Sequence, residues 1–334
     1  MGGSIVVIAT VFVLASASSL SASVVLARTL ERLGERLELT EAMLGLVAAL
    51  ATDAPEITSA ATALVQRQHA VGVGVVAGSN LYNLAALLGL GAVVAGRIAL
   101  HRKVVLLEGA LALWVAAVTF AALIGWLGPR AGLALVLVVL AGYVVLSAMH
   151  PARREQLPLP GSWRAWLASA VDQQELELLA AVRPRKGGPR DAAVAVVMLV
   201  LVVGASVVME RAASAAGALY SVPGIVIGGI VLAAVTSIPD TVTAIHLATR
   251  GRGSAALSVA LNSNTLNVVV GLFLPAVATG LAGSSGIELF VAACYAGLTL
   301  GLLALAFAQR GLDRRAGGLI IALYLVFATI IVLS

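Results

Sequence analysis

Residues 51–83 read ATDAPEITSAATALVQRQHAVGVGVVAGSNLYN, and residues 235–267 read VTSIPDTVTAIHLATRGRGSAALSVALNSNTLN. Both stretches lie in longer segments, 49–90 and 233–274, which align without gaps at a constant offset of 184 residues. The matched positions include prolines and many polar residues: Thr52 and Thr236, Pro55 and Pro239, Glu56 and Asp240, Ser79 and Ser263, Asn80 and Asn264, Asn83 and Asn267. Two unrelated apolar helices would share mainly Ala, Leu and Val. The pattern therefore predicts an internal duplication whose polar residues form a site.

The composition predicts an integral membrane protein. The chain has 334 residues, of which 60% are hydrophobic and 11% charged, and its mean hydropathy is +1.05. Soluble domains carry about 25% charged residues, so a soluble fold is excluded, and a disordered chain would be far less hydrophobic. The net charge of +5 does not indicate a nucleic-acid partner, because the basic residues form short clusters between apolar runs. Cys294 is the single cysteine, which excludes internal disulfides and cysteine-based metal sites.

Ten apolar runs are each long enough to cross the hydrocarbon core as a helix. Their approximate limits are 4–26, 43–66, 71–96, 104–126, 131–149, 192–210, 225–248, 255–280, 289–308 and 317–333. Strands of outer-membrane barrels are shorter and alternate in hydrophobicity. No Lys or Arg precedes the first run, so we expect a retained helix there rather than a secretory signal. The predicted fold class is an all-α integral membrane protein with ten transmembrane helices.

The distribution of Lys and Arg predicts the orientation of these helices. Loops after the odd-numbered helices hold 18 of the 21 basic residues, and loops after the even-numbered helices hold 3. Basic loops face the cytoplasm. We therefore expect both termini outside, in a plasma or bacterial inner membrane.

The longest connection, residues 150–191, divides the chain into two halves of five helices. We expect a first repeat at 1–149, a basic cytoplasmic linker at 150–191 and a second repeat at 192–334. Trp163 to Val182 suits a short helix lying on the membrane surface. Because five is an odd number, the second repeat enters the membrane from the opposite side. Inverted repeats of this kind are typical of secondary transporters, with a substrate site near the midplane.

Glu56 and Asp240 fall within predicted membrane spans. A carboxylate at that depth is costly, so it faces the bundle interior and finds a cation, a proton or a partner. No span contains a central basic residue to pair with it. Pro55 and Pro239 precede the two acids, and the missing proline N–H releases the carbonyl oxygens four residues back, at Ala51 and Val235. A simple helix kink is the alternative explanation for these prolines.

Hydroxyl and amide side chains complete the predicted site. In each case a Ser or Thr precedes an acid or an Asn by four residues, so the two share a helix face. The full set of candidate ligands is Glu56, Asp240, Asn83, Asn267, Thr52, Thr236, Ser79, Ser263 and the backbone carbonyls of Ala51 and Val235. All are oxygen donors, which hard cations such as Ca²⁺ and Na⁺ select, whereas zinc or copper favour His or Cys. The alternative for each hydroxyl is a hydrogen bond to its own helix backbone.

Asp53 is a third acid in this region and has no acidic counterpart, since Ser237 occupies the matching position. It could be an extra ligand, a proton carrier or part of the access path, and Ser237 shares this position as a candidate. Glu108, Glu210 and Glu288 lie toward the ends of predicted spans, and we expect them at the lipid headgroups.

With these residues in view, the sequence resembles the sodium/calcium exchanger branch of the cation/calcium antiporter superfamily. That family carries G-[ST]-[SA]-x-P-[ED] and G-S-N-x-x-[ND] signatures in each of two inverted repeats. The corresponding residues here read ATDAPE at 51–56, VTSIPD at 235–240, GSNLYN at 78–83 and NSNTLN at 262–267.

The resemblance implies that Glu56 and Asp240 are central ligands shared by Ca²⁺ and Na⁺, with the listed hydroxyls and amides around them. It also implies that the first and sixth helices slide to alternate access. Ala51, Val235 and Asn262 replace family glycines, and Asp53 replaces Ser or Ala. These departures leave open which ion is transported and which ion drives transport.

The leading functional hypothesis is an antiporter that exchanges Ca²⁺ for Na⁺ by alternating access. A proton-coupled cation exchanger is the alternative within transport, and a cation channel or an intramembrane enzyme represents a different class. An enzyme is disfavoured because the chain lacks the H-E-x-x-H and G-x-S-x-G motifs. We expect no cofactor, and as partners only inorganic cations and the lipid bilayer, with no nucleic acid and no obligatory protein.

Overall fold

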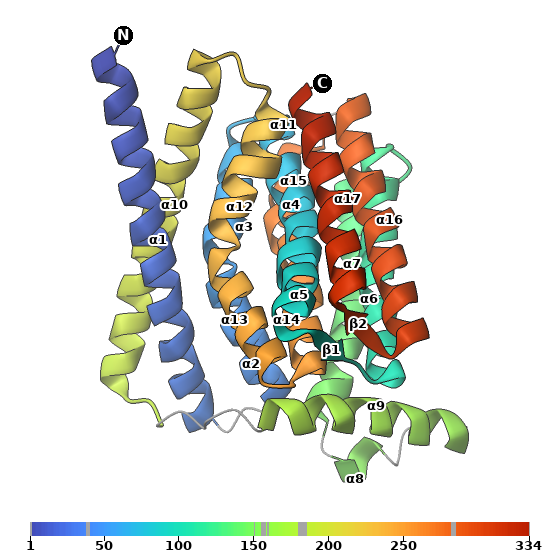
Figure 1. Cartoon of the computed structure of the whole chain (residues 1–334). Coiled ribbons are helices and arrows are strands. Elements are labelled where there is room, and N and C mark those ends of the chain that lie inside the picture. Colours follow the sequence, from blue (N-terminus) through green and yellow to red (C-terminus); the bar gives the residue numbers. More distant parts are fainter. Residues whose placement is uncertain are drawn as a thin grey trace.

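The structure is a computed structural model that describes residues 2–37, 41–149, 151–154, 158, 160–179, 186–281 and 285–333. It is built mostly of helices that stand side by side (Figure 1). Eight described helices are long and apolar enough to cross a membrane. Six are single helices: α1 (Gly2–Arg36), α6 (Arg102–Leu123), α7 (Pro129–Ala148), α10 (Pro189–Leu219), α16 (Gly286–Gln309) and α17 (Arg314–Leu333).

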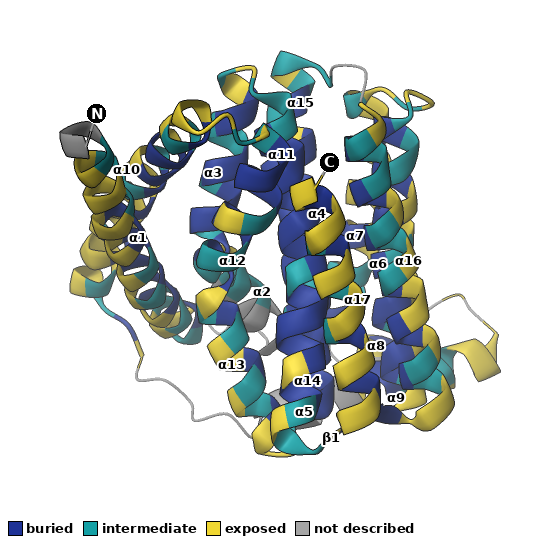
Figure 2. Cartoon of the chain, turned by 45° about the horizontal axis from the view of Figure 1, so that its top comes forward, coloured by how far each residue is buried: buried dark blue, intermediate teal, exposed yellow. Residues whose placement is uncertain are grey.

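The other two are composite helices in which a π-helical segment joins two α-helical segments. The first, His69–Ala95, consists of α4 (His69–Asn83), η1 (Leu84–Leu90) and α5 (Gly91–Ala95). The second, Gly253–Thr279, consists of α14 (Gly253–Leu266), η3 (Asn267–Phe273) and α15 (Leu274–Thr279). Both end at a glycine in the left-handed region, Gly96 with φ 86° and Gly280 with φ 80°. These helices are the most deeply buried of the bundle (Figure 2).

Two further predicted spans are broken helices. Gly224–Thr236, made of α11 (Gly224–Val226), η2 (Ile227–Leu232) and α12 (Ala233–Thr236), is followed by α13 (Ile238–Thr249) after a bend of 50°. The span expected at 43–66 is α2 (Glu41–Thr52) and α3 (Ala54–Val65), interrupted at Asp53. In each case a proline lies in the first turn after the break, where its missing N–H is tolerated.

The number of spans therefore differs from the sequence expectation. With 12 residues each, α2 and α3 are about 18 Å long, less than the roughly 30 Å of a hydrocarbon core. The described residues give eight candidate spans, or nine when the bent pair counts as one. The expected total of ten stays a prediction. α1 and α10 also extend beyond the expected limits of 4–26 and 192–210, to Arg36 and across 189–219.

α1 and α10 form a pair at one side of the bundle. In Figure 1 α1 descends from the labelled N-terminus while α10 rises from the lower end, so the two run in opposite directions. A hydrogen bond of 2.6 Å joins the buried hydroxyls of Ser19 and Ser206. Near the lower end, Arg32 forms an ion pair with Asp191 at 3.3 Å. These contacts fasten the two helices to each other near mid-length and near one end.

The two halves of the chain also touch through backbone. A Cβ at Gly78 of α4 would lie 2.3 Å from the Cα of Gly229 in η2. Gly78 permits this crossing because any larger residue there would overlap the Gly229 backbone, whereas a Cβ at Gly229 would reach Gly74 only at ordinary contact distance. Small residues serve this role where membrane helices pack closely.

The linker lies across one end of the bundle, which we call the linker end. It contains α8 (Pro151–Arg154) and α9 (Gly161–Leu179), and α9 runs across the bundle rather than along it (Figure 1). Arg154 forms an ion pair with Asp172 at 2.8 Å, and Lys103 of α6 donates to Ser169 at 2.7 Å. A helix therefore forms over most of the 163–182 segment, as expected. Linker residues 150, 155–157, 159 and 180–185 lie outside the described part of the chain.

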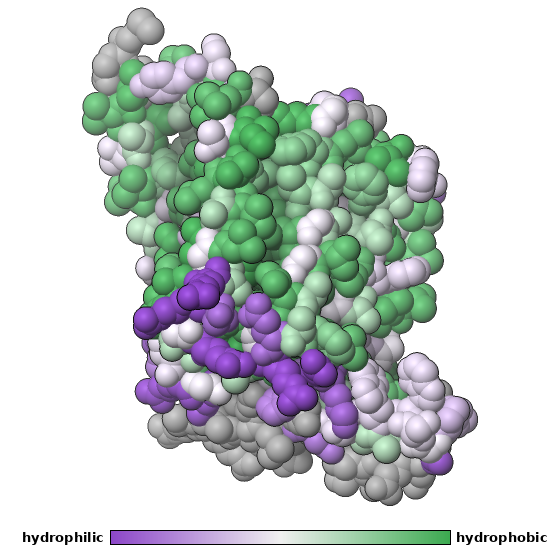
Figure 3. All heavy atoms as spheres, turned by 45° about the vertical axis from the view of Figure 1, so that its right-hand side comes forward, coloured by the Kyte–Doolittle hydropathy of each residue, from purple (hydrophilic) through white to green (hydrophobic). Residues whose placement is uncertain are grey.

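A small two-stranded ladder at the linker end was not expected from the sequence. β1 (Arg97–Ala99) pairs antiparallel with β2 (Gly311–Asp313). Figure 3 shows hydrophilic residues gathered at this end, below a broad apolar surface. Both chain termini lie toward the other end (Figure 1), which we call the opposite end.

Candidate cation-binding site

Three buried acids meet where the two broken helices approach each other. Asp53 lies at the break between α2 and α3, Glu56 in the first turn of α3, and Asp240 in the first turn of α13. One carboxylate oxygen from each lies within 4.8 Å of the others. Their relative exposures are 1%, 1% and 3%. The expectation that Glu56 and Asp240 face the protein interior is therefore confirmed.

Neutral donors surround Glu56. Ser237 donates a hydrogen bond to Oε1 at 2.9 Å, and the Asn267 amide donates to Oε2 at 2.9 Å. The Ser79 hydroxyl also lies beside this carboxylate. Hydrogen bonds to an ionised acceptor are among the stronger ones in proteins. Glu56 is thus held in one orientation by residues from the second half of the chain.

Asp53 and Asp240 form the other side of the cluster and have fewer donors. Ser263 Oγ lies 2.8 Å from Asp53 Oδ1 and 3.4 Å from Asp240 Oδ2, and its single proton can serve only one of them. Thr52 lies within hydrogen-bonding reach of Asp240. Asp53 Oδ2 is buried and finds no donor among the described residues. This side of the cluster is therefore rich in acceptors.

Four asparagines connect the two composite helices beneath the acids. Asn80 donates to the backbone carbonyl of Asn264 at 3.2 Å, and Asn264 donates to that of Asn80 at 3.1 Å. Asn83 donates to Ser263 and to the Asn264 side chain at 3.1 and 3.0 Å. Within the described chain, the amide oxygens of Asn83 and Asn267 are buried without a donor. An unsatisfied buried acceptor is costly, and a cation is a suitable partner for it.

The remaining predicted ligands have a different environment. Thr52 donates to the carbonyl of Ala49 at 3.0 Å, and Thr236 donates to that of Leu232 at 2.9 Å. These are the hydrogen bonds to the residue's own helix that the sequence left open as the alternative. Helix breaks at Asp53 and Ser237 follow the carbonyls of Ala51 and Val235. A ligand role for these carbonyls and hydroxyls stays a prediction.

Asn80 and Asn264 are site residues to which sequence reasoning assigned no role. Their match at the 184-residue offset was the available signal, and the structure shows that they tie α4 to α14.

The expectation that Glu108, Glu210 and Glu288 reach the headgroups is wrong, because their exposures are 2%, 0% and 7%. Glu108 accepts from the hydroxyls of Ser258 and Tyr143, which lie on other helices, and Glu210 Oε1 lies 2.8 Å from the hydroxyl of Ser214. The Glu288 carboxylate accepts from the backbone N–H of Ser285, and the Ser285 hydroxyl accepts from that of Glu288.

A cavity connects the acids to the linker end. Its volume is about 940 Å³, and it lies between α1 on one side and α2 and α13 on the other. Asp240 and Thr52 line its inner part, and Arg28, Glu31 and His246 line it closer to the linker end. The cavity therefore extends from the carboxylate of Asp240 toward the linker end.

Comparison with known proteins agrees with this geometry. The model of the family described as sodium/calcium exchanger protein matches residues 5–150 and 192–333. The chain belongs to this family. Both halves of the exchanger are matched, and the unmatched stretch corresponds to the linker.

Two curated proteins are similar to this chain. This chain is 28% identical over 236 residues to Inner membrane protein YrbG of Escherichia coli (strain K12), and the match covers 70% of this chain and 68% of that protein. It is 33% identical over 116 residues to Sodium/potassium/calcium exchanger 2 of Gallus gallus, covering 32% of this chain but only 18% of that protein. The match to the second relative thus spans less than a fifth of that protein's length.

Solved structures share the fold. The H⁺/Ca²⁺ exchanger CAX superposes with a TM-score of 0.66 at 13% identity, over 98% of this chain and 86% of CAX. The structure of native YfkE gives a TM-score of 0.63 at 16% identity, over 97% of this chain and 92% of YfkE. The sodium-calcium exchanger NCX_Mj gives 0.56 at 18% identity, over 96% of both chains. The family match and the candidate spans together make this chain a multi-span membrane protein of the sodium/calcium exchanger protein family.

Proposed function

We propose that this exchanger is a secondary antiporter that moves Ca²⁺ against Na⁺ by alternating access. The observation that carries the proposal is the buried cluster of Asp53, Glu56 and Asp240 beside two amide oxygens that lack donors. Three ionised carboxylates this deep in a membrane protein need positive charge close by. No lysine or arginine forms a described ion pair with them. A transported cation is the partner that fits.

The donor set suits a calcium ion with sodium as its competitor. Calcium takes 6–8 oxygen ligands and accepts carboxylates in one- or two-oxygen coordination. The proposed ligands are the carboxylates of Asp53, Glu56 and Asp240 and the amide oxygens of Asn83 and Asn267, with Thr52, Thr236, Ser79, Ser263 and the Ala51 and Val235 carbonyls as further candidates. Na⁺ uses the same oxygen chemistry, so both ions can occupy one site in turn. No resident cofactor is required.

We also propose that the ten helices form two inverted repeats, 1–149 and 192–334, joined by the cytoplasmic linker 150–191. The reciprocal hydrogen bonds of Asn80 and Asn264 support a twofold relation, since each residue makes the bond that its counterpart makes. α3 and α13 begin and end at positions related by the 184-residue offset, at 54 and 238 and at 65 and 249. The opposite directions of α1 and α10 in Figure 1 support inversion. Both termini then lie outside a plasma or inner membrane.

The described conformation suits the half of a transport cycle that opens toward the linker end. The large cavity reaches Asp240 from that end. At the opposite end α10 packs against α3, and the pocket there is lined by other residues. Sliding of α1 and α10 along the bundle would close the first path and open the second.

Coupling to protons is a second candidate function, favoured by Asp53. The Asp53 and Asp240 carboxyls lie within hydrogen-bonding reach of each other and share the Ser263 hydroxyl, whereas Ser237 at the matching position donates to Glu56. A pair of facing carboxylates can bind a proton in place of a cation. The fold shared with a protein named H⁺/Ca²⁺ exchanger fits this alternative as well.

Calcium uptake into proteoliposomes under an imposed sodium or pH gradient tests both candidates. We expect sodium-driven uptake that Glu56→Gln or Asp240→Asn abolishes. Uptake driven only by a pH gradient, and lost in Asp53→Ser, would favour proton coupling instead. Calcium flux without any counter-ion gradient would indicate a channel. Unchanged flux in Glu56→Gln would show that the proposed site is wrong.

A further inference from the structure

Glu210 is a fully buried carboxylate that the central site does not use. It lies on α10 with a relative exposure of 0%. Ser214, one turn further along α10, lies 2.8 Å from Glu210 Oε1 and donates at 2.9 Å to Oε1 of Gln68 in the turn between α3 and α4. Glu210 Oε2 is buried and has no donor within the described chain. The Ser214 hydroxyl has a single proton, so it serves either Gln68 or the Glu210 carboxylate, and it brings the two acceptors together where α10 meets the α3–α4 turn.

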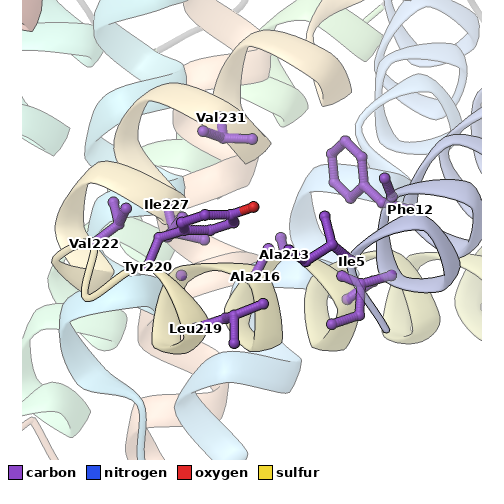
Figure 4. A pocket seen from close by; sticks show the side chains of 13 residues that line it. Ile5, Phe12, Ala213, Ala216, Leu219, Tyr220, Val222, Ile227 and Val231 are labelled. Atoms are coloured by element: carbon purple, nitrogen blue, oxygen red, sulfur yellow. The ribbon is translucent and has the colours of Figure 1, made fainter. Parts of the chain in front are cut away.

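The surroundings of this link are apolar. Met209 and Ala213 of α10 share one hydrophobic cluster with Ala60, Ala63 and Leu64, three residues of α3. We call this contact the α10–α3 seam. A small pocket of about 270 Å³ lies nearby between α1, α10 and η2, and its labelled side chains are almost all apolar (Figure 4). That pocket is lined by none of the three central acids, and α10 packs against α3 at this end.

The seam has a counterpart that is open. At the 184-residue offset, α3 corresponds to α13, and α10 to α1, the first helix of the other half. The cavity of about 940 Å³ separates α1 from α13 at the linker end, whereas α10 and α3 are in contact. Alternating access requires the seam to open when this cavity closes. Opening must part Glu210 from Gln68 and bring water to its carboxylate.

An opened seam leads along α3 from Gln68 to Glu56. Gln68 follows the last turn of α3, and Glu56 lies in the first turn, 12 residues earlier. Helical geometry places the two about 18 Å apart along the path. Glu210, next to the Gln68 end, would be the carboxylate that an incoming cation meets before it reaches the central acids.

We propose that Glu210 is the gate residue of the path from the opposite end. When the seam is closed, it shares the Ser214 hydroxyl with Gln68 of the α3–α4 turn. When the seam is open, its carboxylate attracts the transported cation toward Glu56. This inference rests on the proposed transport function. The two roles of Glu210, in the closed seam and in the open seam, can be tested separately from that function.

The first test measures the apparent KM for calcium separately from each side of the membrane. We expect Glu210→Gln to raise KM about tenfold for calcium supplied at the opposite end, the loss of one interaction with a charged group, and to leave KM at the linker end unchanged. Glu108→Gln is a matched control, because Glu108 is also a buried carboxylate that accepts from a serine but packs between α6 and α14. An equal change of KM on both sides in Glu210→Gln would overturn the capture role.

The second test needs no transport. In a Cys294→Ser background, Ala213→Cys places a thiol in the seam, where Ala213 is 4% exposed. We expect Ser214→Ala to increase labelling of this thiol by a membrane-impermeant maleimide applied at the opposite end, because the closed state has lost its link. Unchanged labelling would overturn the gate. If the wild-type protein moves no cation while Ser214→Ala still increases labelling of the thiol, the proposed transport function is wrong and the gate at the α10–α3 seam is still supported.

Discussion

Replacing Asp53 with Ser, the residue at the matching position of the second repeat, should stabilise the cation-free protein and weaken its response to calcium. The three acidic side chains have oxygens within 4.8 Å of one another. At an effective dielectric constant of about 20, two unit charges at that distance repel by about 3.5 kcal/mol. Asp53 takes part in two such pairs. Its removal therefore relieves about 7 kcal/mol when all three are ionised, and less when bound protons already neutralise part of the charge.

Thermal unfolding of the purified protein in detergent, with a chelator or with calcium, measures both effects. The Asp53→Ser variant should unfold at a higher temperature than wild type in chelator and gain less from added calcium. Ser59→Ala is the matched control, because Ser59 is buried in the same helix and donates to the Pro55 carbonyl rather than to an acid. A variant that unfolds earlier than wild type in chelator, or gains as much from calcium, would refute the reasoning.

Three more predictions follow from the same contacts. Ser237→Ala removes one of the donors to Glu56, at 2.9 Å, and should weaken calcium binding by about tenfold, which calcium titration of the purified protein measures. Lowering the pH should reduce calcium affinity, because protons compete with the cation for the clustered carboxylates; binding isotherms across pH that coincide would contradict this. Gly78→Ala should destabilise the protein by about 1–3 kcal/mol, because its Cβ would overlap the Gly229 backbone, whereas Gly142→Ala, in open space, is the control in thermal unfolding.

Much of the central site was predictable because the two halves of the sequence agree on it. The match of Glu56 with Asp240 marked the acids, and the paired prolines marked the places where the two helices break. The detailed contacts were not predictable. Ser237 donates to Glu56 across 181 residues of sequence, and spacing within one helix carries no information about such a contact.

The errors have a common physical origin. Hydropathy averages over a window, so it gave one continuous apolar run at 43–66 and no sign of the break at Asp53 between α2 and α3. It placed Glu108 and Glu210 near the membrane surface because they lie toward span ends. Glu108 accepts from Ser258 on a distant helix. Glu210 lies beside Ser214, whose hydroxyl also reaches Gln68 in the turn between α3 and α4. The periodicity of one helix does not report such partners.

The bonded pairing of α1 with α10 has a mechanical consequence. Ser19 and Ser206 join the two helices near mid-length, and Arg32 and Asp191 join them near one end. Because these contacts join α1 to α10, a displacement of either helix also displaces the other. In the proposed transport cycle, this joint movement opens one route to the acids only as it closes the other, so ions cannot leak down their gradients.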